Sequence, residues 1–412
     1  MAVYAPVAAL IVLAFIAGMA GLALFYDARR FLLLIFPLTF AYESANLIMA
    51  VVLAAAVSFM AGMLQGGRLE VRVPYPVLFL LVWVSVFYGW SQAGDKDLAR
   101  YVVQHNYLMP MMVFIFIYNL KPDINLIRGN LTAVSFVAAI VGALTLAMYL
   151  RTGVPRIVFQ WGSQNQGAAF LGVALSYPIL ALLGAKTRIG RLFWLGIVCA
   201  IGAGILVTQT RAILLACILG MIYVGWHERR VIKVMAPMLL AAAVMAPALF
   251  LTRFVMLVGM GPHADWSSVG RVQIWLNSLK LLPQYIFIGM GINNFGGIYK
   301  ATYPFSFLKA VHPHNLLLFF IFEIGVVGMI AYLALVVSCL LQGHRAVQKS
   351  GLSLEDETTR VLVALNAGVL ILLIAGVADA YLRDPRTAVV IWSYMAFQLT
   401  LAGRLKLNHA GD

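Results

Sequence analysis

The feature that most constrains the fold is a succession of apolar segments separated by polar links. Many of these segments run for roughly 17–25 residues without a charge, which is the length that crosses a bilayer core. Only 11% of the residues are charged, whereas an ordinary soluble domain has about a quarter. We therefore expect an all-α polytopic integral membrane protein with about twelve transmembrane helices. The apolar segments lie at about 5–25, 31–64 (one long or kinked span, or two short ones), 75–92, 101–119, 127–150, 166–184, 191–207, 210–226, 233–252, 313–341, 361–381 and 386–403.

Basic residues in the links indicate the orientation of the chain. If the N-terminus is inside, the basic links at 186–191 and 229–233 become cytoplasmic, in line with the positive-inside rule. The long polar stretch after residue 252 then lies outside. We therefore predict three regions: helices 1–9 at 1–252, one large external loop with short helices at 253–312, and helices 10–12 with a short cytoplasmic tail at 313–412.

The net charge of +14 is not explained by the cytoplasmic links alone. Nearly as many Lys and Arg residues fall on the predicted outer side as on the inner side. An anionic ligand would explain their presence there, but short translocated loops can also tolerate a few arginines. No basic soluble domain is present, so no nucleic-acid partner is predicted. The outer set includes Arg29, Arg30, Arg151, Arg156, Arg211, Arg253, Arg271, Arg383 and Arg386.

The sharpest cluster of reactive side chains is His312-Pro313-His314-Asn315, directly before the apolar run that begins at Leu316. Because Pro suits the first helical turn, His312 is expected to cap the helix and His314 to be its second residue. The positive end of the helix dipole disfavours imidazolium, so His314 is predicted to stay neutral and able to act as a general base. The alternatives are a histidine that merely caps the helix and a metal site. No further His, Cys or carboxylate lies nearby in the sequence, so no metal is predicted.

Two arginines are candidates for anion binding. Arg211 precedes an apolar run that is only just long enough to cross, so it is expected at the outer boundary of the membrane. There it either snorkels or binds an anion, and guanidinium grips phosphate oxygens well. Arg271 begins a predicted amphipathic helix at 271–282, and Trp275 lies four residues on, on the same helical face. A solvated arginine stacked on a tryptophan would give the same pattern.

Two further links carry polar side chains, and two roles are open for each link. Asp379 and Arg383 are four residues apart, so they either form a helical ion pair or Asp379 orients a catalytic or phosphate-binding group. Gln164 and Asn165 precede a span, where they either hydrogen-bond a sugar or cap the helix.

No motif indicates a metal, a disulfide or a nucleotide cofactor. Asp95 and Asp97 form an acidic pair of the kind that can hold a metal, but capping of the next helix explains them well. Cys199, Cys217 and Cys339 lie singly in apolar runs and are expected to be buried thiols. The chain has no Gly-rich phosphate loop, so ATP-driven transport is not indicated.

The order of several motifs resembles the loop-to-helix signature of the O-antigen ligase and polymerase superfamily. The likeness covers roughly residues 160–325. It consists of Arg271, Trp275, Pro283, Gly289-Met-Gly291, Phe295, His314-Asn315 and Glu323-Ile-Gly325, together with Gln164-Asn165 and Thr210-Arg211.

This resemblance implies a GT-C-like, metal-independent glycosyltransferase without cofactors, in the bacterial inner membrane with its active site facing the periplasm. The donor would be a glycan on undecaprenyl pyrophosphate, and the acceptor a lipid A–core oligosaccharide. His314 would deprotonate the acceptor hydroxyl, while Arg211 and Arg271 would hold the pyrophosphate, and attack would invert the anomeric centre. Supporting roles fall to His312, Asn315, Asn165, Gln164, Trp275, Asp379 and Arg383.

Other functions share parts of this pattern. A repeat-unit polymerase and a protein O-oligosaccharyltransferase have the same signature, so they remain alternatives to the expected ligase. A transporter or flippase for lipid-linked glycans would need a similar basic cavity without a base. Such transporters often have inverted repeats with interrupted helices at matching positions, and no clear pair is visible.

Overall fold

The computed structural model describes residues 45–65, 71–154, 158–159, 163–232, 236, 266–304, 310–350 and 354–410. These residues form helices and links, with no strand among them. The predicted spans at 5–25 and 233–252 lie outside the described residues, apart from residue 236, as do 31–44 and the loop residues 253–265 and 305–309. The predicted all-α fold is confirmed for the described part of the chain.

The helices follow the apolar segments of the sequence. One predicted segment, 101–119, is interrupted by a π-helical turn but continues as a helix on both sides. The helices are α3 (Ala45–Gln65), α4 (Pro76–Ser91), α5 (Lys96–Val102), the π turn η2 (Val103–Leu108), α6 (Met109–Leu120), α7 (Ile124–Thr152), α8 (Gln164–Gly184), α9 (Arg188–Thr208), α10 (Arg211–His227), α13 (Trp266–Tyr285), α14 (Phe295–Thr302), α15 (Leu316–Ser350), α16 (Glu357–Gly376), the 3-10 turn η3 (Tyr381–Arg383) and α17 (Pro385–Ala410).

Six helices of the described part are long and apolar enough to cross a membrane, namely α7, α8, α9, α15, α16 and α17. The apolar helices α4 and α10 are shorter. The chain is thus a multi-pass membrane protein. The count of about twelve spans stays a prediction.

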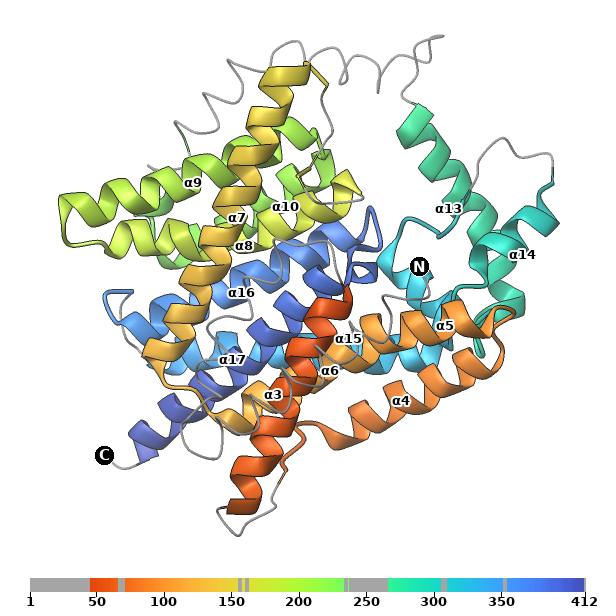
Figure 1. Ribbon diagram of the computed structural model, residues 1–412, viewed down its shortest axis with the longest axis horizontal. Coiled ribbons are helices and arrows are strands. Elements are labelled where there is room, and N and C mark those ends of the chain that lie inside the picture. Colours follow the sequence, from red (N-terminus) through yellow and green to blue (C-terminus); the bar gives the residue numbers. More distant parts are fainter. Residues whose placement is uncertain are drawn as a thin grey trace, which may run out of the picture.

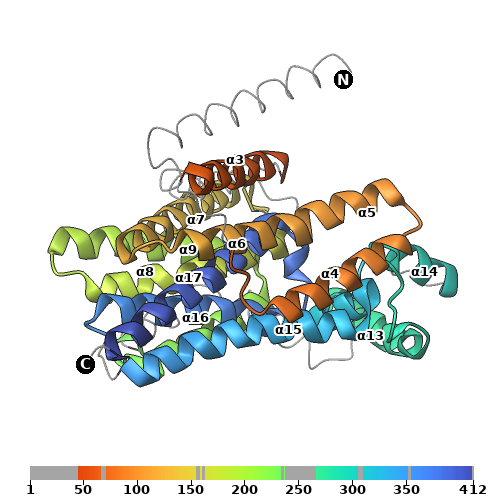
Figure 2. The same cartoon turned by 90° about the horizontal axis from the view of Figure 1, so that it is seen from below.

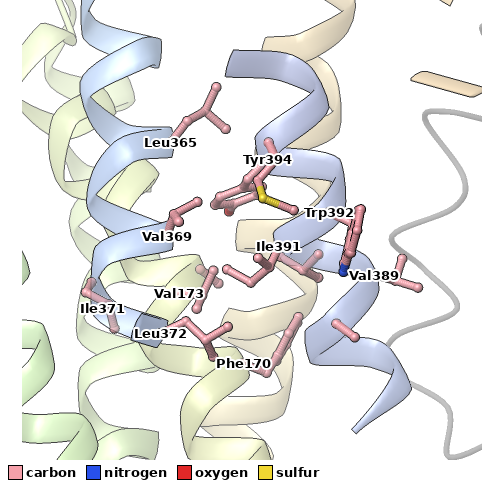
Figure 3. Packing of buried hydrophobic residues seen from close by; sticks show 14 of the residues in the cluster. Phe170, Val173, Leu365, Val369, Ile371, Leu372, Val389, Ile391, Trp392 and Tyr394 are labelled. Atoms are coloured by element: carbon pink, nitrogen blue, oxygen red, sulfur yellow. The ribbon is translucent and has the colours of Figure 1, made fainter. Parts of the chain in front are cut away.

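The centre of the bundle is built from α8, α16 and α17, whose side chains interdigitate as Figure 3 shows. Trp392 is fully buried there and donates its indole N–H to the Tyr332 hydroxyl at 2.9 Å. Helices nearer the outside of the bundle are less buried: 89% of the most apolar stretch of α17 is buried, but only 28% of that of α9. The apolar side chains that α9 leaves exposed are those expected of a helix that faces lipid.

Helices α13 and α14 lie across one end of the bundle (Figures 1 and 2). In Figure 2 α15 runs across the view, whereas α13 is seen nearly end-on. Side chains from α13, α14, α15 and the links between them together form a small second core. This core consists of Ile274, Leu281, Met290, Phe295, Tyr299, Ala310, Leu318 and Phe322.

The predicted helix at 271–282 is confirmed and is longer than expected, since α13 spans Trp266–Tyr285. Pro283 lies within this helix, two residues before its end. Leu279 is 52% exposed, whereas Ile274 and Leu281 are 5% and 4% exposed. The helix therefore buries Ile274 and Leu281, while Leu279 faces outward.

The structure also tests the predictions made for Asp95 and for the three cysteines. Asp95 is the N-cap of α5, and its carboxylate accepts hydrogen bonds from the backbone N–H groups of Asp97 and Leu98. The capping interpretation is therefore confirmed. Cys217 and Cys339 are buried as expected, but Cys199 is exposed, because α9 lies at the outside of the bundle.

Candidate functional site

The His-Pro-His-Asn segment lies at the end of the bundle that α13 and α14 cover. The prediction that His312 caps the helix was wrong, because α15 begins at Leu316 and its N-cap is Asn315. The Asn315 carboxamide oxygen accepts from the backbone N–H groups of Leu317 and Leu318, at 2.9 and 3.1 Å. His314 precedes the helix in a left-handed conformation, with φ 48°, which is uncommon for a non-glycine residue. The two histidines therefore project from the link that precedes α15.

The centre of the site is the carboxylate of Asp379. His312 Nε2 and His314 Nδ1 each lie 3.2 Å from the same oxygen, Oδ1. The second oxygen, Oδ2, accepts a hydrogen bond from the Asn165 side chain at 2.8 Å. It also lies 3.7 Å from a guanidinium nitrogen of Arg271. Asp379 lies between α16 and η3, outside any helix. It therefore does not form the helical ion pair with Arg383 that was one of its two predicted roles.

The electrostatics of the site favour an ionised carboxylate beside a neutral imidazole. Burial lowers the pKa of His312 from 6.5 to about 4, despite its hydrogen bond to Asp379. Burial alone would raise the pKa of Asp379, but hydrogen bonds from His312 and His314 outweigh it and hold that pKa well below its ordinary value. These two pKa changes correspond to a neutral His312 that donates its Nε2–H to the ionised Asp379 carboxylate.

Helix α13 presents two side chains to this centre. Arg271 reaches the Asp379 carboxylate, and its side chain is 25% exposed. Trp275 donates its indole N–H to the backbone carbonyl oxygen of His314 at 3.0 Å. The two residues therefore share one helical face, as their spacing of four predicts. The tryptophan acts as a hydrogen-bond donor that holds the backbone of His314.

Asn165 and Asn315 tie the site to the bundle from two further helices. Asn165 lies in the first turn of α8, which explains how it reaches Asp379. The Asn315 side-chain amide donates to the Val377 carbonyl oxygen at 2.9 Å, so the start of α15 is joined to the end of α16. Gln164 is the first residue of α8 and is half-buried.

Arg211 is the half-buried first residue of α10. Helices α10 and α16 run antiparallel, because Asn366 donates to the Tyr223 hydroxyl at 2.9 Å while the earlier Gly220 approaches the later Ile371. The start of α10 therefore meets the end of α16 that leads into the site. Arg211 thus lies at the same end of the bundle as the two histidines.

Arg383, the other candidate arginine, lies on η3. Its guanidinium is 6.0 Å from the ring centroid of Phe319, and its backbone carbonyl oxygen accepts from Asn106 at 3.1 Å. It shares a small pocket with His312. Arg383 therefore lies near His312, with its guanidinium against an aromatic ring.

The three central side chains could also hold a divalent cation. The ligand atoms of His312, His314 and Asp379 lie within 4.8 Å of one another, and two imidazoles with a carboxylate are a common transition-metal donor set. The sequence did not predict this set, because Asp379 is 65 residues from His314. Against such a use, Arg271 places a positive charge on the same carboxylate.

Two residues of η2 that support the site were not predicted from the sequence. Asn106 on η2 holds Arg383, and Tyr107 beside it donates to the Glu323 carboxylate at 2.9 Å. The only signal available was a run of polar residues, 104–107, at the start of an apolar segment.

Chemically, the arrangement combines a proton acceptor with cations. The Nδ1 atom of His314 faces a carboxylate, which orients the ring and stabilises the imidazolium that would form on proton uptake. Arg271 lies next to this carboxylate, and Arg211 and Arg383 lie at the same end of the bundle. Such a site suits proton abstraction beside a developing negative charge.

Comparison with known families identifies part of the chain. Residues 198–333 match the family model described as O-antigen ligase. The resemblance predicted from the sequence is thereby confirmed over these residues. The matched stretch includes Arg211, Arg271 and His314 but ends before Asp379. A search of the curated proteins returned no match.

Proposed function

We propose that this protein is an O-antigen ligase that transfers a glycan from undecaprenyl pyrophosphate to a hydroxyl of a lipid A–core oligosaccharide. The observation that carries the proposal is the contact of His314 with the buried carboxylate of Asp379, beside Arg271. The family match supports this class of reaction generally. The donor, the acceptor and the roles of individual residues are our own inference.

In the proposed reaction His314 is the general base. Its Nδ1–H donates to Asp379, which leaves Nε2 as the acceptor for the proton of the attacking hydroxyl. Asp379 stabilises the resulting imidazolium and fixes the ring orientation. Trp275 holds the backbone of His314, and the Asn315 side chain anchors the following position by donating to the Val377 carbonyl oxygen. His312 donates to the same carboxylate oxygen and remains neutral.

The leaving group in this reaction is a diphosphate, which gains negative charge as the glycosidic bond breaks. Arg211 and Arg271 are proposed to bind it, because guanidinium groups pair bidentately with phosphate oxygens. The cations would replace the metal that many glycosyltransferases use for this purpose. Attack from the side opposite to the leaving group would invert the anomeric centre.

The location follows from the chemistry. A preactivated lipid donor suits a compartment without ATP, so the site is proposed to face the periplasm, with the chain in the inner membrane. In this topology helices 1–9 occupy 1–252, the periplasmic loop 253–312, and the last helices 313–412.

Polymerases and protein O-oligosaccharyltransferases would use the same centre with a different acceptor. A flippase would need the cations but no base, and the Asp379–His314 pair favours an enzyme over it.

The test is reconstitution of the purified protein with the lipid-linked glycan and three separate acceptors: lipid A–core, a second lipid-linked glycan and a protein. A product with lipid A–core alone is the expected result. Elongation of the lipid-linked glycan would identify a polymerase, a modified protein the third alternative, and translocation without any product a flippase. The matched variants Arg211→Ala and Arg271→Ala should each weaken transfer, whereas Arg188→Ala, at the other end of α9, should not.

A further inference from the structure

Helix α15 is broken a few turns after the site, at Gly325, where φ is 71° and ψ is 172°. In an unbroken helix the Val326 N–H would donate to the Phe322 carbonyl oxygen. The break separates these two groups. The Val326 N–H instead donates to the Ile286 carbonyl oxygen at 2.7 Å, and the Phe322 carbonyl oxygen accepts from the Met290 N–H at 2.5 Å. The segment 286–294 thus satisfies both backbone groups that the break releases.

This segment is tightly shaped to reach α15. Gly289, Gly291 and Asn293 have φ values of 74°, 92° and 60°. A Cβ atom on Gly289 would lie 2.9 Å from the Phe322 carbonyl oxygen, so only glycine permits the approach. The motifs Gly289-Met-Gly291 and Glu323-Ile-Gly325 are therefore two halves of one contact. We call residues 286–294 together with 322–326 the α15 junction.

The side chain of Glu323 closes this junction. Glu323 is only 5% exposed, and its two oxygens accept from different elements. Oε2 accepts from the Tyr107 hydroxyl at 2.9 Å, and Oε1 from the Asn293 backbone N–H at 3.3 Å. Its carboxylate thus joins α15 to η2 and to the 286–294 segment.

The same segment is also bound to α4. The Ile292 N–H donates to the Gly89 carbonyl oxygen at 2.9 Å, and the Asn294 side chain donates to the Gln92 carbonyl oxygen at 2.9 Å. The junction is therefore held from α4, η2 and α15 at once.

The junction lies between the two parts of the candidate site. It directly follows α13, which carries Arg271 and Trp275, and Glu323 belongs to the helix that His314 precedes. Glu323 and Asn293 line one small pocket together with His312 and Arg383. A shift of the junction would therefore move α13 relative to the histidines.

We propose that Glu323 is a positioning residue, which locks the junction so that α13 presents Arg271 and Trp275 to Asp379 and His314. Glu323 contacts none of the groups that we assign to the reaction, so it acts through the backbone that it holds. Displacement of a reacting group by about 1 Å can cost about a hundredfold in rate. The kinetic consequence rests on the proposed function, whereas the geometric consequence does not.

Two substitutions separate positioning from simple packing. Glu323→Leu keeps the bulk but leaves the Tyr107 hydroxyl and the Asn293 N–H without their acceptor. Glu323→Gln can accept from the Asn293 N–H with its oxygen and donate to the Tyr107 oxygen with its amide, so it should rescue the function. Glu355→Leu, an exposed glutamate beyond the far end of α15, is the matched control.

The geometric readout is the distance between spin labels on Leu276 of α13 and Ile330 of α15, which are 50% and 57% exposed. The exposed Cys199 is replaced by serine to avoid labelling it. Hydrogen exchange of the Met290 and Ile292 amides is measured in parallel. We expect Glu323→Leu to broaden the distance distribution, to speed exchange, and to lower kcat per folded molecule by at least about tenfold. Glu323→Gln and Glu355→Leu should stay within about threefold of wild type.

An unchanged distance distribution and kcat in a folded Glu323→Leu protein would overturn the proposal, and so would equal losses in Glu323→Gln and Glu323→Leu. Should Glu323→Leu not fold, Tyr107→Phe removes one of the two hydrogen bonds, and an unaltered distance and kcat there would overturn it too. If the wild-type protein makes no product with donor and acceptor, the proposed function fails, and the spin-label and exchange measurements still decide the role of Glu323.

Discussion

Trp275 donates its indole N–H to the backbone carbonyl oxygen of His314 at 3.0 Å. This bond joins the helix that crosses the end of the bundle to the segment that carries the proposed base. Because His314 has a positive φ, its backbone needs such support to stay in place. The orientation of the imidazole thus depends on α13, a helix that lies outside the membrane-spanning bundle in the proposed topology.

Trp275→Phe should keep the aromatic packing but remove this hydrogen bond. We expect kcat to fall about tenfold, because the His314 backbone loses its restraint, with little change in thermal stability. The measurement is kcat and KM for transfer in proteoliposomes. Trp226→Phe, at an 87% exposed position, is the matched control and should behave as wild type. Equal kcat in both variants would show that the bond has no role.

Asp379→Asn should preserve the shape of the site and remove its central negative charge. The histidine would lose the group that fixes its tautomer and stabilises its protonated form, so we expect kcat to fall by about a hundredfold or more. Asp97→Asn is the control, since that side chain is 90% exposed. Rates of transfer measured at saturating donor decide the matter, and a loss below threefold would speak against the assignment.

Protonation of His312 should make the protein less stable in acid. The pKa of His312 is about 4 in the folded protein and 6.5 without burial. Between these values the unfolded chain binds a proton that the folded one does not, so stability falls as the pH decreases from about 6.5 to 4. At pH 5 the loss from this residue amounts to about 2 kcal/mol.

Thermal unfolding of wild type and His312→Gln at pH 7 and pH 5 measures this effect. The difference between the two pH values should be smaller in the variant. The same difference in both proteins would mean that His312 does not titrate as described.

Chelation of metals should leave transfer unchanged, because Arg211 and Arg271 are proposed to bind the diphosphate. The measurement is the initial rate after dialysis against EDTA, with and without added Mg²⁺ or Zn²⁺. A rate that is lost on chelation and restored by a metal would instead assign His312, His314 and Asp379 to a metal centre.

The sequence predicted the helices well, because their apolar runs have the length of a membrane span. It also placed Arg271 and Trp275 on one helical face, since a spacing of four is a local property. Asp379 was left between two roles, because its contact with His314 spans 65 residues.

The cap at His312 was wrong for a local reason. Pro313 does suit a first helical turn, but Asn315 is the better capping side chain and moves the helix start to Leu316. The role of Glu323 could not be predicted from the sequence. Its partner Tyr107 lies in a π turn, and its partner Asn293 lies in a segment whose shape depends on two glycines.

The central claim is that His314 removes the proton from the acceptor hydroxyl. The most direct test measures donor binding and transfer side by side in wild type and His314→Ala, with His344→Ala as the control for loss of an imidazole at the other end of α15. The account predicts that His314→Ala still binds the lipid-linked donor but transfers at least about a hundredfold more slowly. Transfer by His314→Ala within threefold of wild type would contradict it.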